Sequence, residues 1–316
     1  MSIDRNTQQG FSLIELAVVI IVVGLLLTGL LLPLATQVEI SRVEETKRQL
    51  AQIREALLGF AMVNGRLPCP ATPDTRGHEA PWTPTATNEA GEKWCARTPG
   101  ADGNWNTPDD VTFQHGFVPA VTLGIPGPVN NDELLVDAWG NPFRYSVSRR
   151  DLTEGPAATP LDLDDDEWDF VVTGEMRQEG PAVFQGSADL LVVCNNSPNE
   201  TNGAINDTAC DDTVTPPSIP VTEVAPAVFF SMGPDGAALR DTNSLHQLEN
   251  AGERKPPSLE RFPPANQYPI SADGDLVFVS RERRGQVDDA SYFDDLVEWI
   301  SPTVLYYKLV SAGHLP

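Results

Sequence analysis

Gly10-Phe11-Ser12-Leu13-Ile14-Glu15-Leu16 opens an apolar run that continues to Ala35, and Glu15 is the one charged residue in that run. At about 1.5 Å per residue, a helix over residues 11–35 can cross a hydrocarbon core of about 30 Å with some tilt. A charge at the centre of a bilayer costs roughly 2.5–3.5 kcal/mol, so such a residue is usually retained for a partner. The stretch therefore predicts a membrane helix with one functional carboxylate. The alternative is an ordinary signal anchor whose glutamate reaches the membrane interface.

The residues before Phe11 are mostly polar and carry only two charges, Asp4 and Arg5. A secretory signal peptide has a basic n-region and a small-residue cleavage site after its apolar part, and neither is present. Cleavage is therefore expected before the apolar run, between Gly10 and Phe11. This glycine, the aromatic residue, the isolated glutamate and the apolar run together resemble the class III leader of type IV pilins and type II secretion pseudopilins. The resemblance covers about the first 35 residues.

The resemblance implies that a membrane prepilin peptidase cuts after Gly10 and that the new Phe11 amine is N-methylated. An α-amine has a pKa near 7.7–8.0 and is mostly cationic at neutral pH. Glu15 lies in the first turn of the helix, where the helix dipole favours an anion. Between chains, its carboxylate can pair with the Phe11 amine of a neighbouring subunit. We expect this pairing to neutralise both charges and to set the axial register of a filament.

Beyond Ala35 the helix is predicted to continue and to become amphipathic. Val43, Leu50, Ile53, Leu57 and Phe60 recur at intervals of three or four, and charged residues fill the positions between. Asn64-Gly65, followed by two prolines, ends the pattern. The chain is thus divided into a leader, a transmembrane or filament-core helix, an amphipathic continuation and a globular head, over residues 1–10, 11–35, 36–65 and 66–316.

The head is expected to be rich in loops, because the chain contains 28 prolines and 24 glycines. Strands are predicted near residues 116–123, 142–148, 168–173, 189–194, 226–231 and 275–280. Segments 66–112, 195–223 and 240–270 are predicted as irregular or surface loops. The fold class is therefore α+β and pilin-like, with a long N-terminal helix packed on an antiparallel sheet that carries large loop insertions.

Two helices are predicted near the C-terminus. A short one is expected around residues 294–300. A second begins after Ser301-Pro302, which suits an N-cap followed by the first helical position, and ends before Gly313. Its buried side is expected to hold Val304, Leu305, Leu309 and Val310.

The four cysteines, Cys69, Cys95, Cys194 and Cys210, all follow the apolar run. An even number in an exported domain indicates disulfides, and four cysteines permit three pairings. Joining nearest neighbours gives Cys69–Cys95 and Cys194–Cys210, each worth roughly 3 kcal/mol in the chain-entropy model.

Three segments of the head resemble major pseudopilins: Asp137-Ala138-Trp139-Gly140-Asn141-Pro142, Ser231-Met232-Gly233-Pro234-Asp235-Gly236 and Asp294-Asp295-Leu296-Val297-Glu298-Trp299. In that family the last two segments help to form a calcium site. The resemblance implies Asp235, Asp294 and Asp295 as candidate Ca²⁺ ligands, completed by main-chain carbonyls. The alternative is that Asp235-Gly236 is only a turn and Asp294 only a helix cap. The first segment is interpreted as a structural turn.

The composition and motifs limit the function. A net charge of −24 argues against a nucleic-acid-binding surface, which needs basic stripes. The chain has no Gly-x-Ser-x-Gly, His-Glu-x-x-His or P-loop motif, and we expect no enzymatic activity. The leading hypothesis is a minor pilin or pseudopilin. Its expected location is the inner membrane, single-pass, with a cytoplasmic N-terminus and a periplasmic head, followed by incorporation into a pilus or pseudopilus.

The expected partners are other pilin or pseudopilin subunits, the prepilin peptidase and the inner-membrane assembly platform. Glu15 argues against the terminal tip subunit of secretion pseudopili, which in the resembled family typically lacks this carboxylate. The rival hypothesis is an adhesin-like pilin whose loops, residues 66–112 and 195–223, bind a surface, a substrate or exported cargo.

Overall fold

The computed structural model describes the chain in segments. These are residues 12–80, 95–98, 111–112, 114–148, 170, 176, 190–198, 209–234, 236, 250, 276–283 and 292–315, with the side chains of 25–36, 96–98 and 111–112 excepted. The predicted strand at 168–173 and the predicted loop at 240–270 lie almost wholly outside these residues. The chain divides into two units, Met1–Glu45 and Thr46–Pro316.

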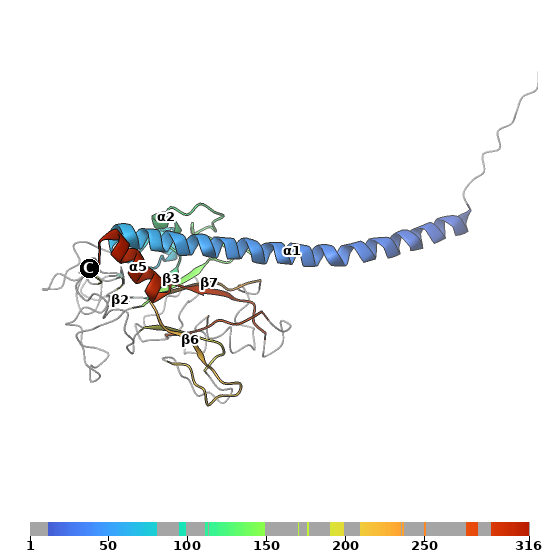
Figure 1. Ribbon diagram of the computed structural model, residues 1–316. Coiled ribbons are helices and arrows are strands. Elements are labelled where there is room, and N and C mark those ends of the chain that lie inside the picture. The colour runs from blue at the N-terminus through green and yellow to red at the C-terminus, as the bar shows by residue number, and fades with distance from the viewer. Residues whose placement is uncertain are drawn as a thin grey trace, which may run out of the picture. The chain divides into compact units, whose positions relative to one another are not determined.

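A single helix, α1, runs from Leu13 to Asn64 (Figure 1). This confirms the prediction of one continuous helix. It ends at Gly65, whose φ of +68° is a left-handed conformation that favours glycine and whose N–H donates to the carbonyl of Ala61 at 2.8 Å.

The first unit contains the N-terminal part of α1. Its described apolar side chains are exposed, from Leu13 at 87% to Val23 at 47%. Among the side chains that the structure describes, no helix meets the length and apolarity of a membrane span. The predicted span, residues 11–35, lies partly outside those described side chains.

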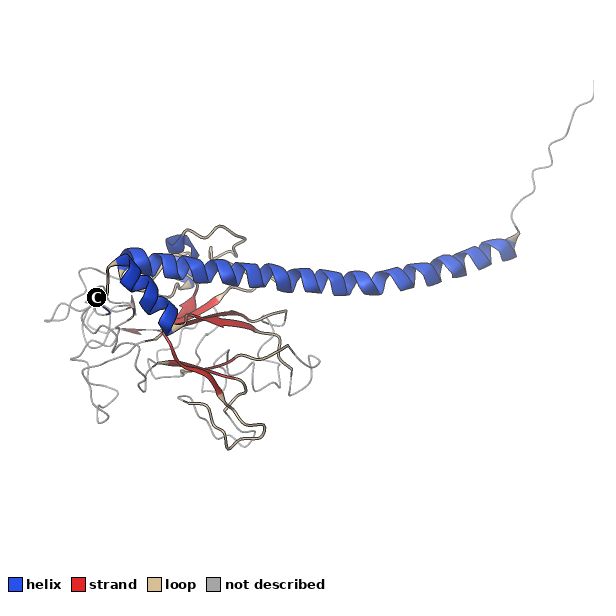
Figure 2. Cartoon of the chain, viewed as in Figure 1, coloured by secondary structure: helices blue, strands red, loops and turns tan. Residues whose placement is uncertain are grey.

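The second unit is built around a four-stranded antiparallel sheet with the order β3-β4-β7-β9 (Figure 2). Its strands are His115–Phe117, Arg144–Val147, Ala227–Ser231 and Leu296–Trp299. Strands β4 and β7 lie within predicted strands, and β3 begins one residue before the predicted segment 116–123. The predicted segment 116–123 divides, because its second half forms the short helix α2, Ala120–Leu123.

Strand β9 corrects the prediction of a helix around residues 294–300. All four of its residues pair with β7, from Val228↔Trp299 to Ser231↔Leu296. Leu296 and Ile300 pack into one hydrophobic cluster, whereas Val297 and Trp299 pack against another. This alternation of faces is the period of a strand, and the apolar surfaces on both sides of β7 impose it.

A second sheet has the order β6-β5-β8, formed by Pro220–Ala225, Leu191–Cys194 and Val277–Val279. Strands β5 and β6 are antiparallel, but β5 and β8 are parallel. The prediction of an antiparallel sheet is therefore confirmed for the first sheet and wrong for this pair. A separate two-stranded pair joins β1, Ala96–Thr98, to β2, Val111–Thr112.

Two hydrophobic clusters hold the layers of this unit together. The first joins Leu50, Ile53 and Leu57 of α1 to Tyr145 and Phe229 of the first sheet, which confirms these three positions of the predicted face. The other two, Val43 and Phe60, are only half-buried. The second fills the space between the sheets, and its members include Phe230, Val228, Leu191, Val193 and Phe278. Strand β7 is therefore buried on both faces, because alternate residues belong to different clusters.

The C-terminal helix α5 spans Pro302–Ala312, with Ser301 at the N-cap and Gly313, at φ +80°, at the C-cap, as predicted. Leu305 and Leu309 are buried in the first cluster. The prediction is wrong for Val304 and Val310, which are 43% and 37% exposed. One buried stripe, four residues apart, is enough for a helix at the edge of the core.

Both disulfides follow the nearest-neighbour pairing: Cys69–Cys95 and Cys194–Cys210. Part of the predicted surface loop 195–223 is more ordered than expected, since β6 begins at Pro220. Asn196 and Ser218 are buried there, and the Ser218 hydroxyl donates to the carbonyl of Asn196 at 2.6 Å.

Candidate functional site

The first turn of α1 joins Ser12 to Glu15. The backbone N–H of Ser12 donates to Oε2 of Glu15 at 3.3 Å, and the N–H of Ile14 donates to the Ser12 hydroxyl at 3.4 Å. Ser12 lies at the N-cap position and Glu15 at the third helical position, which are the positions of a capping box. The first N–H groups of a helix have no partner within it, so these bonds stabilise its start.

The Glu15 carboxylate therefore lies beside the backbone of Ser12, the residue after Phe11. Gly10 and Phe11 themselves lie outside the described residues. The Glu15 side chain is exposed in this single chain. Sequence reasoning selected Glu15 but missed Ser12, although the spacing Ser-x-x-Glu at the head of an apolar run predicts this arrangement.

In the second unit, the three pseudopilin-like segments meet at one place, which we call the head junction: residues 137–141, 231–236 and 292–295. Asp137 is its centre. Its Oδ1 accepts hydrogen bonds from the N–H groups of Trp139 and Asn141, both at 2.9 Å. Its Oδ2 accepts from the Ser231 hydroxyl at 2.5 Å. The Asx turn at Asp137 therefore connects directly to the end of β7.

The same junction brings Gly233 against Asp294. Gly233 has φ +66°, and a Cβ placed on it would lie 2.6 Å from Oδ2 of Asp294. The Gly233 carbonyl accepts from the Asn141 amide at 2.7 Å, and its N–H donates to the Ser231 hydroxyl at 3.1 Å. Glycine is required here because the backbone is left-handed and there is no room for a side chain.

Asp294 and Asp295 are both buried but have different neighbours. Oδ2 of Asp294 accepts from the Tyr292 hydroxyl at 3.0 Å. Oδ2 of Asp295 accepts from the Asn250 amide at 2.7 Å, and Asn250 exchanges two bonds with the backbone of Val279 in β8. Within the head junction, Asp294 therefore lies against the 231–236 segment, whereas Asp295 connects through Asn250 to the second sheet.

These positions bear on the predicted calcium ligands. The structure brings Asp294 beside Gly233, two residues before Asp235 in the same segment, but Asp235 itself lies outside the described residues. Asp295 bonds toward Asn250 instead. Within the described residues, no group of three or more His, Cys, Asp or Glu side chains is placed to hold a metal ion. The carboxylate and carbonyl oxygens at the junction are of the type that calcium prefers.

Burial alters the proton affinity of Asp137. Its removal from water raises the pKa of the carboxyl above its usual value, and the bonds from Ser231 and from the turn N–H groups offset this only in part. The junction therefore contains a carboxyl that ionises less readily than an exposed aspartate. No proton-transfer partner accompanies it among the described residues, and its bonds are those of a structural turn.

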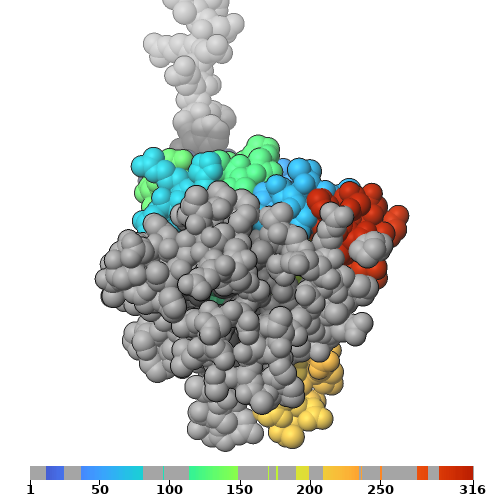
Figure 3. Space-filling view, turned by 90° about the vertical axis from the view of Figure 1, so that its left-hand side faces the viewer, coloured from blue at the N-terminus to red at the C-terminus, as the bar shows by residue number. Residues whose placement is uncertain are grey.

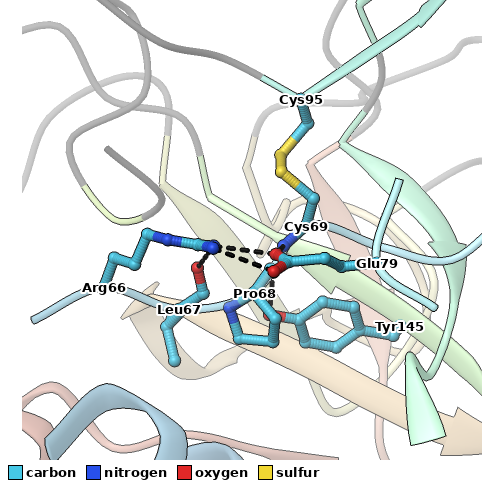
Figure 4. Close-up of a disulfide and its surroundings, with 7 residues drawn as sticks. All are labelled: Arg66, Leu67, Pro68, Cys69, Glu79, Cys95 and Tyr145. Atoms are coloured by element: carbon cyan, nitrogen blue, oxygen red, sulfur yellow. Dashed lines mark hydrogen bonds and ion pairs between the residues drawn. A yellow bond between two sulfur atoms is a disulfide. The ribbon is translucent and has the colours of Figure 1, made fainter. Parts of the chain in front are cut away.

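A second buried polar arrangement surrounds the Cys69–Cys95 disulfide (Figure 4). Arg66, 3% exposed, makes two bonds to the Glu79 carboxylate, at 2.8 and 2.9 Å. Glu79 also accepts from the N–H of Cys69, and the Tyr145 hydroxyl donates to the carbonyl of Pro68. Burial, and secondly the nearby Glu79 charge, raise the pKa of Tyr145 well above its usual value.

Comparison with known proteins identifies the N-terminal segment. Residues 5–31 match the model of the prokaryotic N-terminal methylation motif. This is the motif of the class III prepilin leader, and it is consistent with a type IV pilin-like or pseudopilin subunit. It implies processing by a prepilin peptidase, membrane anchoring and assembly with other pilin subunits. No curated protein and no solved structure matches the chain.

Proposed function

We propose that the protein is a minor subunit of a type IV pilus or a type II secretion pseudopilus, assembled through its N-terminal helix. The methylation motif at residues 5–31 carries the proposal. The capping arrangement of Ser12 and Glu15 supports it, because the Glu15 carboxylate accepts from the N–H of Ser12, the residue after the proposed cleavage product's first residue. A large head, residues 66–316, suits a subunit of low abundance better than a bulk repeat unit.

In the proposed mechanism, cleavage after Gly10 creates a cationic amine on Phe11 four residues before Glu15. In the precursor, Glu15 satisfies the N–H of Ser12 in its own chain. In a filament, its exposed carboxylate pairs with the Phe11 amine of a neighbour. An ion pair removed from water is strong where both charges are matched, and removal of one partner leaves the other charge uncompensated.

Mass spectrometry of the native protein tests the processing step. The expected mature chain begins at Phe11 and carries one added methyl group. A mature protein that keeps Met1 would contradict the proposal.

The assembly step is tested with Glu15→Ala, and Glu55→Ala serves as a control in an exposed position of the same helix. We expect Glu15→Ala to be cleaved normally but to be depleted from sheared filaments, whereas Glu55→Ala is incorporated like the wild type. Equal incorporation of the two variants would exclude the proposed ion pair.

We also propose that the head binds calcium through Asp294 and Asp235, with main-chain carbonyls of the 231–236 segment as further ligands. The position of Gly233 against Asp294 supports this, because it brings the two segments into contact. Titration calorimetry with CaCl₂ on the full chain should show binding that Asp235→Asn abolishes. The absence of calcium heat in the wild type would contradict this part of the proposal and leave the filament role unaffected.

A binding role for the head is the second candidate. It is favoured by the ordered part of segment 195–223, which the Cys194–Cys210 disulfide and the buried Asn196 connect firmly to the second sheet. Replacement of residues 199–208 by a short Gly-Ser linker tests it. Lost attachment with intact filaments supports binding, and lost filaments support a scaffolding role.

A further inference from the structure

A polar hollow lies at the end of the second sheet. It measures about 530 Å³ and is lined by Asn195, Asn196, Arg281, Glu282 and Arg283. Strands β5 and β8 are parallel, so their carboxyl ends meet at the same edge, and these residues follow the two strands directly. Ligands commonly bind at such an edge in sheets with parallel strands.

The backbone around the hollow is held firmly. The N–H of Ser280 donates to the carbonyl of Cys194 at 2.8 Å, which extends the pairing of β8 with β5. Cys194 is joined to Cys210 by a disulfide. The Asn196 amide donates to the carbonyl of Pro217 at 2.9 Å, and Asn195 accepts from the N–H of Ile219 at 2.7 Å. The lining residues are therefore carried by a preorganised part of the head.

The described lining has a charge opposite to that of the chain. Among its described residues, two arginines and one glutamate give a net positive charge, whereas the whole protein carries −24. The Arg283 guanidinium also lies 5.8 Å from the ring centroid of Trp139, within the range of a cation–π interaction. A guanidinium has five N–H donors, so it can hold a carboxylate and keep its other contacts.

Exposed apolar residues near the lining indicate the kind of ligand. Ile219 and Val221 are 50% and 48% exposed, and the backbone N–H of Ile219 donates to Asn195 of the lining. A small inorganic anion would use only the arginines. A peptide that combines carboxylates with apolar side chains would use both the arginines and these nearby apolar residues.

We propose that this hollow is a docking site for an acidic, partly apolar peptide segment of a partner protein. The site lies in the head and uses neither Phe11 nor Glu15, so recognition of the partner does not depend on filament assembly. This proposal goes beyond the filament role, and its test does not depend on that role.

The test uses the full chain purified in detergent and a fluorescent peptide in which aspartates alternate with valines. A matched peptide with asparagine in place of aspartate is the control ligand. We expect Arg281→Gln combined with Arg283→Gln to weaken binding of the acidic peptide about tenfold or more, the loss of roughly one bidentate pair. Arg76→Gln, which alters an exposed ion pair with Glu133, should leave binding unchanged.

Three results would overturn the proposal: equal binding of both peptides, unchanged binding by the double variant, or equal loss with Arg76→Gln. Inorganic phosphate and a sulfated polysaccharide are also tested as competitors of the labelled peptide. Competition as effective as that of the unlabelled peptide would show that the hollow binds anions in general and would contradict a peptide ligand. If the double glutamine variant fails to fold, Arg281→Lys with Arg283→Lys replaces it. This variant keeps the positive charges but cannot bind a carboxylate through two guanidinium N–H groups, so a partial loss of affinity is expected. Wild-type affinity would contradict the proposal.

Discussion

The Ser231 hydroxyl donates a hydrogen bond of 2.5 Å to Oδ2 of Asp137, across 94 residues of sequence. Both side chains are buried, at 1% and 2% exposure. The bond connects the Asx turn before β4 to the end of β7 and so fixes two of the three pseudopilin-like segments to each other. Hydrogen bonds to ionised groups are stronger than neutral ones, and a buried group that loses its partner carries the full desolvation cost.

Removal of the Asp137 carboxylate should therefore destabilise the head. Asp137→Ala leaves the Ser231 hydroxyl and two turn N–H groups without their acceptor, and we expect a loss of about 3 kcal/mol in the free energy of unfolding. Ser231→Ala should cost about 1–2 kcal/mol. Urea unfolding of the full chain measures both, with exposed Asp212→Ala as the control. A cost for Asp137→Ala no larger than that of the control would show that the bond is not structural.

The raised pKa of Asp137 gives a pH dependence of defined sign. Because the native state binds this proton more tightly than the unfolded state, the contribution of Asp137 favours folding at low pH and is lost as pH rises through its native pKa. Wild-type stability should therefore fall relative to Asp137→Asn as pH rises above 3.8, the ordinary value. Urea midpoints of the two proteins over a pH series measure this difference. Parallel curves would contradict the assignment.

Two glycines with the same φ allow the cost of a left-handed backbone to be distinguished from the cost of a steric clash. Gly233 and Gly124 both have φ +66°, but a Cβ on Gly233 would meet Asp294, whereas one on Gly124 has nothing within 4 Å. Gly124→Ala should cost about 1–2 kcal/mol, the strain of a left-handed residue. Gly233→Ala should cost at least about 3 kcal/mol because of the added overlap. Thermal unfolding of both variants tests this, and equal costs would mean that Asp294 moves aside freely.

Two Arg–Glu pairs allow the stabilising effect of a buried ion pair to be compared with that of an exposed one. Arg66–Glu79 is mostly buried, whereas the side chains of Arg76 and Glu133 are 72% and 53% exposed. Figure 3 shows residues drawn in cyan beside residues drawn in green on one face of the head. Arg66→Met leaves Glu79 partly buried without its partner and should cost about 3–5 kcal/mol.

Arg76→Met is the matched control and should cost no more than about 1 kcal/mol, because water screens the exposed pair. Urea unfolding of the two variants compares them directly. A similar, small cost for both would mean that the Arg66–Glu79 pair contributes little beyond its surface counterpart.

Local patterns predicted the long helix, both disulfides and strands β4, β5, β7 and β8. The amphipathic spacing of Leu50, Ile53 and Leu57 was sufficient for the buried face of α1, because helix periodicity is a local property. The prediction failed at residues 294–300. The segment Leu296–Trp299 is too short for periodicity to separate a helix from a strand, and its pairing with β7 decides the outcome.

Some of the candidate sites could likewise be predicted from local sequence, and others could not. Glu15 could be selected from sequence because a lone carboxylate in an apolar run is unusual in itself, and Ser12 could have been found from the capping-box spacing. The polar hollow could not, because Asn195 and Arg281 are far apart in sequence and meet only through the parallel pairing of β5 with β8.

The sequence by itself determined the N-terminal module: the methylation motif, the apolar helix and its single acid follow from the order of neighbouring residues. For the four cysteines it allowed three pairings and favoured near neighbours, the pairing that the structure shows. Only the tertiary structure decided that Asp137, Ser231 and Asp294 share one junction and that a second sheet covers β7. These arrangements depend on burial and on hydrogen bonds between distant segments, which exist only after the chain has closed its core.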